Sequence, residues 1–218
     1  MFYNGTSFNQ PLDSWDVSTN MVNIRNMFRN TPFNQPINSW NVSSVTDMNA
    51  TFLDTSFNQP LNNWKTDSLS QFRSTFSRSA FNQNINTWNV SKVVVADYAL
   101  SSATFNQPLN NWEFSTDPNI NPRISYMLAD ATSFNQPIND WNVSMMIRMK
   151  GLFKNATSFN QPLDKWDVSN VTDMEITFKN ATSFMQEIRT WNMNPNVFTK
   201  DMFSGATKMI DVYQYSND

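Results

Sequence analysis

The side chains of this sequence that could do chemistry are carboxylates, amides, hydroxyls and indoles, because it contains no histidine and no cysteine. This composition excludes imidazole general bases, thiolate nucleophiles, disulfides and the nitrogen and sulfur ligands of zinc. Asp16, Glu113 or Asp167 could contribute to a glycosidase-like carboxylate pair, but no spacing selects a partner for any of them. No calcium-binding or phosphate-binding loop is visible. We therefore predict a protein that is not an enzyme and holds no cofactor or metal.

The same residues return in register every 24 to 29 positions along the chain. A phenylalanine opens each unit, at Phe8, Phe33, Phe57, Phe81, Phe105, Phe134, Phe159 and Phe184. Seven residues later stands a tryptophan, at Trp15, Trp40, Trp64, Trp88, Trp112, Trp141, Trp166 and Trp191. Such repeats predict a single solenoid over 1–218, with units starting near 8, 33, 57, 81, 105, 134, 159 and 184. Neither end shows a polar cap, so we expect a fragment of a longer array.

Two hydrophobic periods are present in each unit, and residues 159–183 show them best. Trp166 and Val168 alternate with polar residues, which predicts a short strand with one buried face. Val171, Met174 and Phe178 have i, i+3 and i+7 spacing, which predicts a short helix. We therefore predict an α/β solenoid of about eight coils, each a short strand plus a short helix, stacked at about 4.8 Å per coil.

Three rows of side chains are candidates for binding. The tryptophans would suit sugars or bases if exposed, but their alternation with polar residues favours a structural core shared with the phenylalanines. The asparagine after each phenylalanine could hold a ligand, but we predict a ladder between coils, formed by Asn9, Asn34, Asn58, Asn82, Asn106, Asn135 and Asn160. The residue after each tryptophan should face solvent, as a merely solvated row or as a candidate binding face. That row is Asp16, Asn41, Lys65, Asn89, Glu113, Asn142, Asp167 and Asn192.

The repeat pattern Phe-Asn-Gln-Pro-Leu-x-x-Trp-x-Val-Ser-x-Val-x-x-Met covers essentially the whole chain. It resembles a bacterial surface-protein repeat of about 25 residues, a mycoplasma-type repeat of unknown function. That family looks related to the BspA-like leucine-rich repeat. The resemblance implies a leucine-rich-repeat-like solenoid on a surface protein, often an adhesin, and it implies no catalytic residues.

Composition and repeat together limit the function classes. The net charge of −3 argues against a nucleic-acid binder, and no apolar run is long enough to span a membrane. We predict an extracellular or cell-surface module for adhesion or protein–protein interaction, whose partner is a protein or a surface glycan. The alternatives are a structural subunit of an extracellular or viral assembly that docks head to tail through open ends, and a glycan binder that uses the polar face. An insertion with two prolines, 115–122, is either a local specialisation or a tolerated loop.

Overall fold

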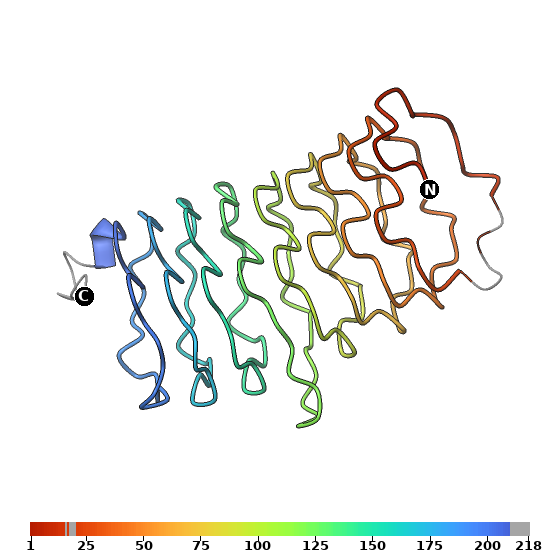
Figure 1. Ribbon diagram of the computed structural model, residues 1–218. Helices are drawn as coiled ribbons and strands as arrows, with labels where there is room; N and C mark the ends of the chain where they lie inside the picture. Colours follow the sequence, from red (N-terminus) through yellow and green to blue (C-terminus); the bar gives the residue numbers. More distant parts are fainter. Residues whose placement is uncertain (16, 18–20, 210–218) are drawn as a thin grey trace.

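Successive repeats of the chain lie side by side as the coils of one elongated stack (Figure 1). The computed structural model describes residues 1–15, 17 and 21–209. Main-chain hydrogen bonds join each coil to its neighbours; the Ile24 N–H, for example, donates to the Asp47 carbonyl, and the Met48 N–H donates to the Gln71 carbonyl. Because these partners lie one repeat away in sequence, the stability of each coil depends on the coils beside it.

The coils do not contain the predicted strand and helix, so the α/β class and the leucine-rich-repeat-like architecture are wrong. Among the described residues, helix is confined to 207–209, and no helix there is long and apolar enough to span a membrane. Strand pairing in the described chain is confined to isolated parallel bridges at one position of each coil. The bridges join Asn23, Asp47, Gln71, Val95 and Arg123 in turn, and then Arg148, Asp173 and Phe198.

Tight turns with left-handed residues replace the predicted helix. Ile176 and Asn180 have φ values of 53° and 58°, whereas an α-helix needs right-handed dihedrals at every position. The N–H groups of Met174, Ile176, Phe178 and Asn180 donate to carbonyls of the next coil, and the Thr177 N–H donates back to the Met174 carbonyl. Consecutive turns satisfy the i, i+3, i+7 spacing as well as a helix does, so the spacing alone could not separate them.

The strand predicted around each tryptophan is replaced by links that side chains make between coils. The Asn34 N–H donates to Asn9 Oδ1 at 2.9 Å, and each later coil repeats this bond at 2.9–3.0 Å. Ring centroids of successive phenylalanines in the row that begins with Phe8 are 5.9–6.3 Å apart. Paired strands lie about 4.7–4.9 Å apart. The amide groups therefore occupy the gap that main-chain pairing would close.

The asparagine row forms a ladder along the stack. Each Oδ1 also accepts a hydrogen bond from a glutamine Nε2 of the next coil, at 2.8–3.3 Å. The row comprises Asn9, Asn34, Asn58, Asn82, Asn106, Asn135 and Asn160, and the Met185 N–H donates to the last of them. These oxygens accept two hydrogen bonds within the protein, so the structure gives the row a structural role.

Aromatic rings fill the interior of the coils. The phenylalanines of the row from Phe33 to Phe184 are fully buried, and the tryptophans from Trp40 to Trp191 are 1–7% exposed. Trp15 differs, with 39% of its surface exposed. Each buried indole N–H donates to a leucine or isoleucine carbonyl of the preceding coil at 2.8–3.2 Å. The tryptophan row therefore holds coils together, and from Trp40 onward it offers no exposed rings to a sugar or a base.

Ile176 lies at a left-handed position that β-branched residues rarely adopt. Asparagine tolerates this conformation, and Asn26 occupies the equivalent position of an earlier coil with φ 54°. Ile176→Asn is expected to raise the free energy of unfolding by about 1 kcal/mol, because it relieves this strain at a half-buried site. Denaturant titration measures the change. The reverse substitution, Asn26→Ile, should be destabilising, and a gain in both variants or in neither would contradict the account.

Candidate functional site

A shallow groove runs across several coils beside the tryptophan row. It consists of three adjoining depressions of 520, 510 and 370 Å³. The first and second share Ser91 and Glu113, and the second and third share Asp140 and Asn142. We call this surface the polar groove; it is lined by residues 86–91, 111, 113–117, 139–144, 165 and 167.

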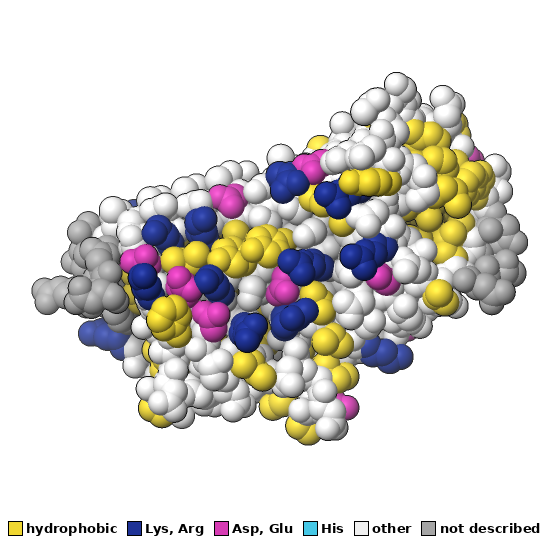
Figure 2. Space-filling view, viewed as in Figure 1, with side chains coloured by type: hydrophobic (Ala, Val, Ile, Leu, Met, Phe, Trp, Pro, Cys, Tyr) yellow, Lys and Arg dark blue, Asp and Glu magenta, His cyan; other side chains and the backbone are white. Residues whose placement is uncertain are grey.

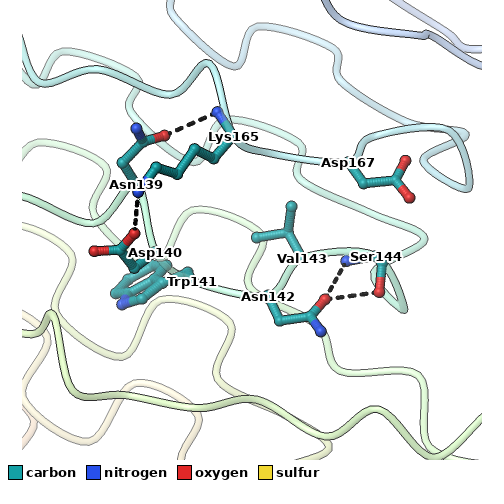
Figure 3. Close-up of a pocket in the computed structure, with 8 residues that line it drawn as sticks. All are labelled: Asn139, Asp140, Trp141, Asn142, Val143, Ser144, Lys165 and Asp167. Carbon is teal, nitrogen blue, oxygen red and sulfur yellow. Dashed lines mark hydrogen bonds and ion pairs between the residues drawn. The ribbon is translucent and has the colours of Figure 1, made fainter.

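Short turns after the tryptophans shape the floor of the polar groove. Asn142 Oδ1 accepts hydrogen bonds from the Ser144 N–H at 3.1 Å and the Ser144 hydroxyl at 2.7 Å (Figure 3). Asn89 makes the same pair of bonds with Ser91. An Asn or Asp two residues before Ser forms such a turn because its side-chain oxygen substitutes for a main-chain acceptor. The side-chain oxygens of Asn89 and Asn142 therefore accept hydrogen bonds within their own coils.

The groove contains half of the row predicted as a binding face. Asn89, Glu113, Asn142 and Asp167 line it. Asn41, Lys65 and Asn192 are exposed but do not line it, and Asp16 lies outside the described residues. Half of the row therefore lies in the groove and the rest outside it. The local turn does not distinguish the two, because Asn41 accepts from Ser43 outside the groove in the same way as Asn142 accepts from Ser144 inside it.

Other residues of the groove lie outside the predicted row, some of them in the insertion that the sequence marked as a local specialisation or a tolerated loop. Asp140 and Lys165 directly precede tryptophans, at positions whose residue type varies from coil to coil. Ser115 and Asp117 belong to the insertion 115–122, where the Asp117 N–H donates to Ser115 Oγ at 3.1 Å. Phe114 anchors this loop, because its buried ring contacts Trp112 and Trp141 edge-on. The extra length of this coil was the signal for the loop residues, and the variation before each tryptophan was the signal for Asp140 and Lys165.

The polar groove is acidic. Glu113, Asp117, Asp140 and Asp167 line it, and Lys165 is the one basic residue of its lining. Lys165 Nζ lies 2.6 Å from Asp140 Oδ1, and this contact raises the pKa of Lys165 (Figure 3). Both side chains are largely exposed, so the pair adds little stability and opens readily for another charged group. The groove thus presents carboxylates to solvent across three coils.

The hydroxyl and then the N–H of Ser169 hold the pKa of Asp167 below its ordinary value. A lowered folded pKa stabilises the protein above the unfolded pKa, near 3.9, and that contribution is lost as the pH falls through the folded value. Asp167→Asn keeps the oxygen acceptor and should remove this acid-sensitive contribution. Relative to the wild type, its free energy of unfolding should rise as the pH drops below about 4. Asn142→Asp should show the opposite trend, and parallel pH profiles for all three proteins would refute the assignment.

The residues of the groove can supply hydrogen bonding and charge. Within 1–15, 17 and 21–209, no three acidic side chains lie close enough together to hold a metal ion. The carboxylates of the groove are distributed one or two to a coil, and two of them, Asp117 and Asp167, accept hydrogen bonds from residues of their own coil. The arrangement suits binding of an extended, positively charged or hydrogen-bonding ligand.

Comparison with known proteins yields one family. The family described as Mycoplasma protein of unknown function, DUF285, matches this chain twice, over residues 22–123 and 116–215. No curated protein and no solved structure matches it. The two matches confirm the resemblance to a mycoplasma-type repeat.

Proposed function

We propose that this chain, which belongs to the family described as Mycoplasma protein of unknown function, DUF285, is a non-enzymatic repeat module. Its polar groove binds an extended basic segment of a partner protein. We place this interaction at a cell or virion surface. The observation that carries the proposal is the groove itself, with four carboxylates against one lysine.

Coil spacing supports an extended polypeptide as the ligand. The rings of Trp112 and Trp141 are 6.2 Å apart, and those of Trp141 and Trp166 are 6.3 Å apart. Alternate residues of an extended strand are about 6.4–6.8 Å apart and point the same way. Lysine or arginine at every second position would therefore meet one coil each, close to the carboxylates of Glu113, Asp140 and Asp167.

Fluorescence anisotropy with a labelled peptide that carries lysine at alternate positions tests the proposal. We expect binding that weakens with salt, and about tenfold weaker binding by Glu113→Gln/Asp167→Asn, equivalent to about 1.4 kcal/mol. The matched control, Asp47→Asn/Asp130→Asn, removes the same charge away from the groove and keeps the oxygens that accept from Asn49 and Asn155. Equal losses in both variants, or no binding, would overturn the proposal. Groove-dependent binding on a glycan array instead would favour a surface glycan as the ligand.

A second candidate is a structural role in which coils of different molecules stack. Trp15 favours it, because this half-exposed indole has no hydrogen-bond acceptor among the described residues, whereas the seven later tryptophans each have one. A leucine or isoleucine carbonyl from a coil of another copy would supply it. Sedimentation should then show concentration-dependent association that Trp15→Phe weakens. Monomers at all concentrations would exclude this role for the chain alone.

A further inference from the structure

A second hollow lies over the left-handed turns of the first three described coils. Its volume is 220 Å³, and it brings Arg25 and Arg29 of one coil together with Arg73, which lies more than 40 residues further along the chain. Arg25 and Arg73 occupy equivalent positions two coils apart. The spacing of these coils is given by the phenylalanine rings beneath them: the ring centroids of Phe28 and Phe52 are 5.6 Å apart, and those of Phe52 and Phe76 are 5.3 Å apart. The polar residues that line this arginine hollow are Arg25, Asn26, Arg29, Asn49, Arg73 and Ser74.

The arginine hollow lacks the counter-ions found elsewhere on the molecule. Lysine, arginine and acidic side chains form a mixed band on the face shown in Figure 2. Arg78 pairs with Asp54 on the same coils but outside the hollow. On the turns of later coils, Arg123 pairs with Asp97, Lys150 with Glu175 and Lys179 with Asp201. No carboxylate lines the hollow, and none in the described chain lies within ion-pair distance of its three arginines.

The donors of the hollow are oriented but incompletely used. The Arg29 guanidinium lies over the Tyr3 ring, 5.2 Å from its centroid, and Nη1 makes only a long hydrogen bond of 3.4 Å to Asn26 Oδ1. Arg29 Nε is buried and has no hydrogen-bond partner. Asn49 Oδ1 accepts from the Arg73 N–H at 2.7 Å, so the Asn49 side chain is fixed with its NH₂ group available to donate. Because stacking and main-chain contacts already order these side chains, a ligand that binds them would cause a smaller loss of conformational entropy.

We propose that the arginine hollow binds a tetrahedral oxyanion, the phosphate or sulfate group of a larger ligand. Guanidinium groups match such oxyanions because two parallel N–H donors meet two oxygens. An anion seated between Arg25 and Arg73 would neutralise guanidinium charges that form no close ion pair in the described chain, although Arg73 also interacts with the more distant Asp97 carboxylate and lies over the Tyr98 ring, 5.9 Å from its centroid. Asn49, from the coil between the two arginines, and Ser74, which follows Arg73 in the same coil, would donate further hydrogen bonds. This site is independent of the polar groove and of its proposed ligand.

Calorimetric titration of the whole chain with inorganic sulfate and phosphate tests the proposal at constant ionic strength. Chloride should compete only weakly at equal ionic strength, because one spherical ion matches the two parallel N–H donors of a guanidinium less well than two oxygens do. We expect Arg25→Gln/Arg73→Gln to bind either anion at least tenfold more weakly while its thermal midpoint stays within a few degrees of the wild type. Arg29 is left unchanged because its Nε is buried and its guanidinium lies over Tyr3. Arg73 lies over the Tyr98 ring at 5.9 Å, so the thermal midpoint also checks that losing this contact leaves the fold intact.

Lys65→Gln/Lys92→Gln is the matched control, because it removes the same charge from exposed positions outside the hollow. The control should bind sulfate and phosphate as the wild type does. Equal weakening in both double variants would show a bulk charge effect and overturn the proposal, as would anion binding that the arginine variant leaves unchanged.

The source of the oxyanion is resolved by two further ligands. A sulfated oligosaccharide and vesicles containing phosphatidylglycerol present the group on a glycan and on a lipid respectively. If either ligand binds the wild type and the lysine variant but not the arginine variant, the result supports the site and shows whether the oxyanion belongs to a glycan or to a lipid. Binding of both ligands that neither variant affects would place the interaction elsewhere and contradict the proposal.

Discussion

Replacing Trp88 with alanine is expected to lower the free energy of unfolding by about 3–5 kcal/mol. The Trp88 ring is 2% exposed, stacks on Trp64 at 5.9 Å and meets Phe72 edge-on at 5.8 Å. Its indole N–H donates to the Leu61 carbonyl of the preceding coil at 3.2 Å. The substitution leaves a cavity between coils and removes the hydrogen-bond partner of a buried carbonyl, and both effects destabilise the stack.

Trp15→Ala is the matched control for Trp88→Ala. Trp15 belongs to the same row, but it is 39% exposed, and its indole N–H has no acceptor among the described residues. We expect it to cost about 1 kcal/mol or less. Chemical denaturation of both variants under the same conditions decides the matter. A loss for Trp15→Ala as large as that for Trp88→Ala would contradict the account of the indole as a link between coils.

Asn82→Ala should cost about 1–3 kcal/mol, because it removes an acceptor that serves two donors of the next coil. Asn82 Oδ1 accepts from the Asn106 N–H at 2.9 Å and from Gln107 Nε2 at 3.3 Å. Both donors lie in the half-buried gap between coils, where the shortened side chain would leave them without a protein partner. Asn82→Asp keeps the acceptor and should cost less than Asn82→Ala.

The control for Asn82→Ala lies two residues away in the same coil. Asn84 Oδ1 accepts only from the Asn86 N–H, and the bond is exposed to solvent. Asn84→Ala should therefore cost less than about 1 kcal/mol. Equal costs for the two alanine variants, measured by denaturant titration, would show that the ladder bond is worth no more than a surface turn.

The secondary structure of the coil could not be predicted from the spacing of apolar residues. Met174 and Phe178 face inward at positions that suit both a helix and a series of tight turns. The hydrogen-bond acceptors distinguish the two structures. The N–H groups of Met174 and Phe178 donate to the carbonyls of Phe198 and Met202 in the next coil, not to carbonyls within a helix. Such partners, 24 residues away, become visible only when the coils are stacked.

The polar groove and the arginine hollow differ in how far they could be predicted from the sequence. Asn89 and Asn142 follow tryptophans, so their shared orientation could be predicted from the repeat. Their place in a groove depends on the insertion, whose loop contributes Ser115 and Asp117. The arginine hollow was invisible in the sequence, because Arg25 and Arg73 line the same hollow only when three coils are stacked.

The sequence by itself determined the period, the family and the residues that return in every unit, because eight aligned copies of one pattern leave no other register. The tertiary structure decided the rest: turns in place of helix and strand, amide and indole bridges in place of paired strands, and the positions of the groove and the hollow. The physical reason is that a main-chain N–H must be satisfied, and in a stacked coil it can be satisfied by the neighbouring coil. Local sequence cannot show which neighbour, side chain or turn supplies that acceptor.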